Sequence, residues 1–206
     1  DLENAPKVME QLYTNKAYKA HLRSRGQKQT IMLGFSDGTK DGGYFMANWA
    51  IFKAKEALTQ ISKQYNIDVV FFDGRGGPPA RGGGKTHQFY ASLGPTIEDK
   101  EVQLTIQGQT ISSNFGTPDS SKYNLEQLIS SGLSNSLGSE NKGFSDEDRA
   151  TMDELATLSY KAYQDFKGHP KFIPYLERIS TLKYYAKANI GSRPSKRSKS
   201  DRLIFS

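Results

Sequence analysis

A strand–helix–strand pattern in the first third of the chain limits the folds that this sequence can adopt. TIMLGF (30–35) and IDVVFF (67–72) are short apolar runs of the kind that form buried parallel strands. Residues 44–65 between them predict a helix, because their apolar side chains recur mostly at three- and four-residue steps: Phe45, Trp49, Phe52, Leu58, Ile61 and Tyr65. Such a unit has a right-handed crossover and parallel strands, so the sequence predicts a helix-rich α/β fold.

Other segments extend this α/β pattern. Residues 5–22 predict a helix, and residues 36–43 (SDGTKDGG) predict a loop. VQLTI (102–106) predicts a third strand, and residues 124–131 another helix. Ser145 opens a further helix, since Ser-Asp-Glu-Asp is close to a capping box, with Asp148 three residues after the cap in place of Glu. From Ile190 onward the sequence predicts a basic loop.

Composition narrows the class of protein further. A chain of 206 residues is long enough for one domain with a sizeable core. It has no run of ~18 apolar residues, so no membrane span is expected, and its lack of Cys fits a reducing cytoplasm. Because it opens on Asp1 and not on Met, we expect an excised segment of a longer chain.

The positive charge is concentrated at one end. The chain carries +6 in total, of which the segment 193–202 holds five basic residues against Asp201. The rest of the chain is near charge balance. This distribution disfavours a globally basic nucleic-acid binder, and we expect no nucleic-acid partner.

The two strand ends predict the position of a site. In parallel α/β folds, ligands bind at the carboxyl ends of the strands. The first strand delivers Ser36, Asp37 and Lys40, and the second delivers Asp73, Arg75 and a glycine-rich loop. If the two strands are neighbours, these groups face one site.

The glycine-rich stretch DGRGGPPARGGGKTH (73–87) allows several interpretations. An ATP-binding loop would need Gly where Pro79 stands, and proline lacks the N–H that a phosphate requires. An Arg-Gly-Gly tail that binds RNA would be longer and more repetitive. The third interpretation is a mobile anion site in which Arg75 and Arg81 bind phosphate or carboxylate, and the fourth is a solvated surface loop.

The SDGTKD segment is also ambiguous when taken alone. The Asp37 carboxylate could hold a hard cation such as Mg2+ or Mn2+, usually with a second carboxylate and waters. Lys40 could bind an anion. Alternatively, Asp37 caps the following helix and Lys40 is solvated.

Three motifs in register resemble the phosphoenolpyruvate carboxylase family: GFSDGTKDGG (34–43), FDGRGGPPARGG (72–83) and GSRPSKR (191–197). The resemblance spans essentially the whole chain. It implies that residues 1–206 are part of the catalytic domain, an (α/β)8 barrel with parallel strands and the active site at their carboxyl ends. Asp73 departs from the family pattern, which more commonly has His there.

The resemblance also implies an activity. The family joins phosphoenolpyruvate and bicarbonate into oxaloacetate and phosphate, a lyase-class reaction of carbon dioxide fixation that supplies the tricarboxylic acid cycle and requires Mg2+ or Mn2+. Bicarbonate attacks the phosphoryl group to give carboxyphosphate and an enolate, which captures the released CO2. The parent would be a cytoplasmic homotetramer with no membrane partner, and in regulated members an aspartate inhibitor binds the loop arginine, here Arg81.

Residue roles follow from the same resemblance. Asp37 would be a metal ligand and Lys40 the catalytic lysine near bicarbonate. Arg75 would bind the phosphoryl group, with Gly76 and Gly77 beside it, and Arg81 would stabilise the carboxyphosphate step. Arg193 would lie near the substrate phosphate. We expect the isolated chain to be inactive; the competing interpretation is a non-catalytic anion- or RNA-binding module that uses the Arg-Gly-Gly loop and the basic tail.

Overall fold

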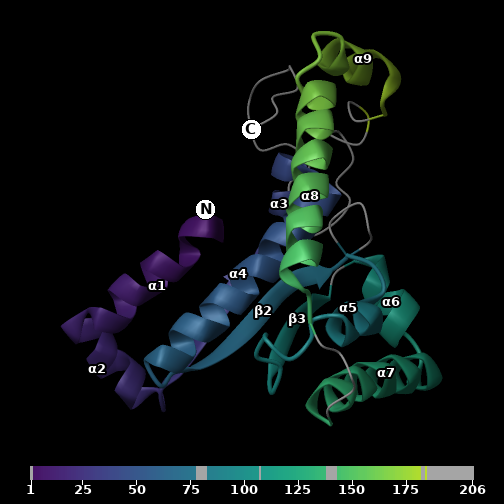
Figure 1. The fold of residues 1–206 in the computed structure, drawn as a ribbon. Coiled ribbons are helices and arrows are strands. Elements are labelled where there is room, and N and C mark those ends of the chain that lie inside the picture. The colour runs from purple at the N-terminus through teal and green to yellow at the C-terminus, as the bar shows by residue number, and fades with distance from the viewer. Residues whose placement is uncertain (1, 78–82, 107, 138–142, 182–183, 185–206) are drawn as a thin grey trace. The chain divides into compact units, whose positions relative to one another are not determined.

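The computed structural model describes residues 2–77, 83–106, 108–137, 143–181 and 184 (Figure 1). The chain divides into two compact units, Asp1–Tyr160 and Lys161–Ser206. The first unit contains the sheet and most of the helices, and in the second α9 (Phe172–Ile179) follows the end of α8. None of the helices in the described ranges is long and apolar enough to cross a membrane.

A three-stranded parallel sheet forms the centre of the first unit. Its strands are β1 (Lys28–Leu33), β2 (Asp68–Gly76) and β3 (Val102–Ile106), in the order β1-β2-β3. Both pairings are parallel, which confirms the predicted βαβ unit and the third strand. The sheet is consistent with part of an α/β fold.

The strand boundaries differ from the prediction. β1 starts two residues earlier and ends at Leu33, because Phe35 already belongs to the next helix. β2 continues four residues past Phe72, since β3 pairs with it as far as Gly76 after an irregularity in register. Asp73 and Arg75 therefore belong to the strand β2 and not to the loop that follows it.

Helix α4 (Tyr44–Gln64) packs beside the sheet and confirms the strongest predicted helix (Figure 1). The side of the helix that is most buried differs from the predicted apolar side, because Phe45, which was predicted to belong to that side, is exposed. Two contacts explain this. One side of the helix faces the sheet through Ile51 and Leu58, while Trp49 and Phe52 stack on each other and meet Phe144 on another side.

The amino-terminal segment contains two helices, not one. After the 3-10 turn η1 (Leu2–Asn4), α1 (Ala5–Thr14) ends at Asn15, and α2 (Lys16–Ser24) starts there. The Asn15 side chain accepts hydrogen bonds from the N–H groups of Ala17 and Tyr18. Asparagine is among the preferred helix caps, so this residue ends one helix and begins the next.

The prediction of a loop at residues 36–43 is wrong, because most of these residues belong to the helix α3 (Phe35–Gly42). The Thr39 hydroxyl donates to the Phe35 carbonyl, and the helix ends at Gly43, whose φ is 78°. Glycine adopts this left-handed conformation without strain. The glycines and aspartates that suggested a loop therefore lie in a short helix and at its end.

The remaining helices of the first unit are α5 (Thr86–Ala91), α6 (Gln109–Phe115), α7 (Pro118–Ser136) and α8 (Asp146–Lys167), the last continuing into the second unit. α7 is longer than the helix predicted at 124–131. At the start of α8, Ser145 and Asp148 exchange side-chain-to-backbone hydrogen bonds, which confirms the predicted capping box.

An ion pair joins α4 to α8. Two Arg149 nitrogens donate to the two Glu56 carboxylate oxygens at 2.7 and 2.8 Å. Burial alone would raise the pKa of Glu56, but hydrogen bonds from Arg149 and Thr96 bring that pKa below its ordinary value of 4.5. The pair should therefore stabilise the fold fully above about pH 4.5 and lose this contribution as the pH falls through the folded-state pKa.

Replacing Arg149 by Met is expected to lower the free energy of unfolding at pH 7 by about 1 kcal/mol. Urea denaturation of the protein at several pH values measures it, and the difference from wild type should shrink below pH 4.5. Lys122→Met is the matched control, because the Lys122–Glu126 pair is exposed and spans 3.8 Å. A pH-independent loss would show that Arg149 acts through packing alone.

Candidate functional site

The carboxyl ends of β1 and β2 are adjacent, as the site prediction required. Leu33, the last residue of β1, pairs with Asp73. Phe35 then begins α3 and lies 5.7 Å from the Arg75 guanidinium carbon, measured to the ring centroid. The groups that follow the two strands therefore share one edge of the sheet.

Asp37 and Lys40 lie in the first and last turns of α3. The Lys40 ammonium donates to the Asp37 carboxylate at 3.1 Å, and the two side chains are 64% and 83% exposed, respectively. Both groups are therefore accessible to a ligand. An exposed pair of this kind is weak, so a stronger anion or cation can replace either partner.

Arg75 lies almost entirely out of solvent, with 3% of its surface exposed. Its guanidinium stacks on Phe89, 4.0 Å from the ring centroid, and one terminal nitrogen donates to the Gly83 carbonyl at 3.4 Å. Among the described residues, its Nε and Nη1 atoms have no hydrogen-bond partner. Burial lowers the pKa of Arg75, but a guanidinium remains charged in proteins.

Donors without a partner on a buried guanidinium indicate a candidate anion site. Buried polar groups are nearly always hydrogen-bonded, and each exception requires an explanation. The fork of a guanidinium matches the oxygens of phosphate or carboxylate. Arg75 is therefore suited to bind an anion at the strand ends.

The two ends of the glycine-rich loop meet beside Arg75. A Cβ atom at Gly83 would overlap the carbonyl oxygen of Gly77, so the backbone approach there requires glycine. The Tyr44 hydroxyl donates to the Gly83 carbonyl at 3.3 Å, and Gly84 has a φ of +131°. The loop thus returns to the sheet at the Arg75 guanidinium.

A buried polar cluster lies next to Arg75 on β2. The Lys55 ammonium donates to Asp73 Oδ2 at 2.6 Å, and the Tyr90 hydroxyl donates to the same oxygen at 2.8 Å. Lys55 and Asp73 are both fully buried. Burial raises the pKa of Tyr90 above its usual range, and Asp73 raises it further, so the phenol keeps its proton and acts as a donor.

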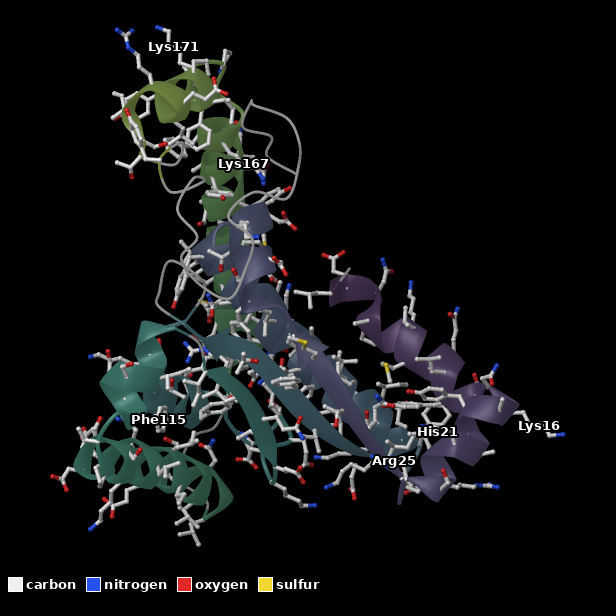
Figure 2. All side chains as sticks on the ribbon, turned by 180° about the vertical axis from the view of Figure 1, so that it is seen from behind. Lys16, His21, Arg25, Phe115, Lys167 and Lys171 are labelled. Atoms are coloured by element: carbon white, nitrogen blue, oxygen red, sulfur yellow. The ribbon has the colours of Figure 1, made fainter. Side chains whose placement is uncertain are left out.

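A pocket of about 480 Å3 opens at the ends of β2 and β3. Gly77, Gly84 and His87 line one side, and residues of α6 and α7, including Phe115, line another. Figure 2 shows Phe115 on the α6–α7 side of the sheet and His21 on α2. Of the three histidines, His87 is the one that lines this pocket, while His21 is exposed.

The structure tests the placement of only some predicted residues. It brings Arg75, Gly76 and Gly77 to the strand end, with Gly76 paired to Ile106. Arg81 and Arg193 lie outside the described residues. Their predicted roles stay predictions.

The described part of the chain does not by itself form a metal site. No group of three or more His, Cys, Asp or Glu side chains that could hold a metal occurs there. Mg2+ and Mn2+ prefer several oxygen ligands. Asp37 is placed to be one such ligand, because it is exposed and follows a strand end.

Sequence reasoning missed Lys55, Phe89 and Tyr90. Lys55 had a signal: it lies three residues after Phe52 and three before Leu58, on the apolar side of a strongly predicted helix. A lysine in such a position requires a buried partner. Phe89 and Tyr90 had no comparable signal, because α5 is a short helix that follows the glycine-rich loop.

The fold and this site define an α/β protein with a buried arginine at the carboxyl ends of parallel strands. The sequence model of the family described as phosphoenolpyruvate carboxylase matches residues 1–204. The chain therefore belongs to the phosphoenolpyruvate carboxylase family.

Three relatives show the extent of the similarity. The phosphoenolpyruvate carboxylase of Corynebacterium diphtheriae is 37% identical over 96% of this chain. Those of Rhodothermus marinus and Azoarcus sp. are 35% and 34% identical over 100% and 98% of it. In each case the chain spans 22% of the relative's length.

Proposed function

We propose that this chain is a segment of the catalytic domain of a phosphoenolpyruvate carboxylase, which converts phosphoenolpyruvate and bicarbonate to oxaloacetate and phosphate. The observation that carries the proposal is Arg75, whose buried guanidinium at the end of β2 has two donor atoms without a hydrogen-bond partner among the described residues. Family membership over residues 1–204 supports it. The parallel sheet supports the further proposal that these strands belong to an (α/β)8 barrel.

In the proposed reaction, bicarbonate oxygen attacks the phosphoryl group, and the bond from phosphorus to the enol oxygen breaks. The products of this step are carboxyphosphate and an enolate. Carboxyphosphate then releases CO2 and phosphate, and the enolate carbon forms the new bond to CO2. Arg75 binds the phosphoryl oxygens, and its charge offsets the negative charge of the transferring group.

Other side chains have proposed positions in this scheme. Lys40 lies on the bicarbonate side, and Asp37 contributes one ligand to Mg2+ or Mn2+. A bound metal would supply a Lewis acid for the enolate oxygen. Aromatic rings lie around Arg75: Phe35 and Phe89 contact its guanidinium, and Tyr90 contacts Phe89. These rings limit the access of water, which could hydrolyse the intermediate.

Roles outside the described residues remain proposals that rest on the sequence. These are the stabilisation of carboxyphosphate by Arg81, inhibitor binding at Arg81, and phosphate binding by Arg193. We also propose, on the same basis, that the parent protein is a homotetramer and is located in the cytoplasm. The alternative of an RNA-binding module also rests on the Arg-Gly-Gly loop and the basic tail.

The proposal is tested by oxaloacetate formation from phosphoenolpyruvate and bicarbonate with Mg2+ or Mn2+. The full-length protein should turn over, and chelation of the metal should abolish turnover. The isolated 206-residue chain should not turn over, because its described residues contain no group of three or more side chains that could hold a metal. Metal-dependent turnover by the isolated chain would refute this last point, and no turnover by the full-length protein would refute the proposal itself.

A further inference from the structure

Asp73 and Arg75 are opposite charges that do not pair. They lie two residues apart on β2, beside the irregularity in register between Asp73 and Gly76. Adjacent residues of α5 contact both of them: Tyr90 contacts Asp73, and Phe89 contacts Arg75. Both are buried, but no ion pair joins these two described residues, and Asp73 Oδ1 has no hydrogen-bond partner among the residues that the structure describes. Two neighbouring buried charges with unused hydrogen-bonding groups would ordinarily pair with each other.

The Asp73 carboxylate is hydrogen-bonded to two donors from different helices and not to Arg75. Lys55 reaches Oδ2 from α4, and Tyr90 reaches the same oxygen from α5. We propose that Lys55 and Tyr90 are positioning residues that hold the Asp73 carboxylate away from Arg75, so that the Arg75 N–H groups stay free for an anionic ligand. This inference rests on the proposed binding of the phosphoryl group by Arg75.

Charge balance in the cluster favours this arrangement. Lys55 and Asp73 form an ion pair, whereas Arg75 forms no ion pair with any described carboxylate. A phosphate or carboxylate ligand would supply the missing negative charge. If Asp73 paired with Arg75, the guanidinium would be neutralised before the ligand arrived.

Aromatic rings keep Lys55 in place. Its ammonium lies 5.0 Å from the centroid of Phe71, 5.3 Å from that of Phe89 and 5.7 Å from that of Tyr90. Phe89 also stacks on Arg75. Rings attract cations but exclude water, so Lys55 is retained beside Asp73 and cannot move to solvent.

The test compares three versions of the full-length protein. Lys55→Met leaves the Asp73 charge without its cation, so the carboxylate is expected to turn to Arg75. The KM for phosphoenolpyruvate should then rise roughly 10- to 100-fold, with a smaller change in kcat. Adding Asp73→Asn removes the competing charge, and the double variant should return to within about threefold of the wild-type KM.

Controls separate this role from a structural one. Lys53→Met removes a neighbouring lysine whose partner is the exposed Asp153, and it should leave KM unchanged. Tyr90→Phe removes a single hydrogen bond and serves if Lys55→Met does not fold; its KM should rise roughly threefold to tenfold. A double variant as impaired as Lys55→Met, or a single variant with normal KM, would overturn the inference.

A second measurement does not depend on turnover. A crystal structure of the Lys55→Met variant should show the Asp73 carboxylate hydrogen-bonded to the Arg75 guanidinium. An Asp73 side chain that stays on Tyr90, with Arg75 unpaired, would overturn the inference even if the enzyme is active. A wild-type protein without turnover would instead refute the proposed function, and the crystal structure would still decide how Asp73 is positioned.

Discussion

Replacement of Arg75 by Met is expected to lower kcat/KM for phosphoenolpyruvate in the full-length protein by about 1,000-fold. The methionine fills a similar space but has neither charge nor donors. The phosphoryl oxygens would then enter a buried site without the Nε and Nη1 groups, which have no partner in the part of the chain that the structure describes. Oxaloacetate formation at varied phosphoenolpyruvate measures the loss.

Two further variants define what the Arg75 result means. Arg75→Lys keeps the charge but not the planar fork, so it should recover only part of the activity. Arg25→Met changes an exposed arginine at the end of α2, just before β1 (Figure 2), and it should have wild-type kinetics. An Arg75→Met protein with normal kcat/KM would show that the phosphoryl group binds elsewhere.

Gly83→Ala is expected to lower kcat/KM about 100-fold, because small displacements of a site have effects of this size. The added Cβ would overlap the carbonyl oxygen of Gly77 and would lie 2.8 Å from that of Arg75. These are backbone atoms, so the end of the loop has to move. Arg75 would lose the Gly83 carbonyl that orients its guanidinium.

Gly132→Ala is the matched control for this substitution. Gly132 lies within α7, and a Cβ there would meet nothing within 4 Å. Alanine is also a better helix former than glycine, so this variant should be at least as stable as wild type and fully active. Equal activity of both alanine variants would show that the loop need not close beside Arg75.

The fold could be predicted from the sequence where a single periodicity dominated. The apolar runs at 30–35 and 67–72 and the long helix between them sufficed for the parallel βαβ unit, which the sheet confirms. The prediction was wrong at residues 36–43, where two aspartates and three glycines indicated a loop. A short helix needs few residues with high propensity once its first residue, Phe35, is anchored in the core.

The site could be predicted only in part, because order along the chain identifies strand ends but not contacts between elements. Arg75 was expected at an anion site; the structure places it at the strand end, buried, with two donor atoms that have no partner among the described residues. The Lys55–Asp73 pair joins residues 18 apart that were assigned to a helix and a loop. Their contact depends on how α4 packs on β2, which periodicity does not specify.

The polar cluster beneath the site also gives the Asp73 position a physical role. The family pattern more commonly has His where this chain has Asp73. A carboxylate next to an arginine that binds an anion would lower the affinity of that arginine for the anion, unless another cation bound the carboxylate. Lys55 provides this cation, so the two residues are best understood as one unit.

The most direct test of the central claim uses bicarbonate labelled with 18O. The full-length protein would be given phosphoenolpyruvate, labelled bicarbonate and Mg2+ or Mn2+, and the released phosphate analysed by mass spectrometry. Attack of a bicarbonate oxygen on phosphorus predicts one labelled oxygen per phosphate, together with oxaloacetate. Unlabelled phosphate would contradict the account, because water and not bicarbonate would then be the nucleophile.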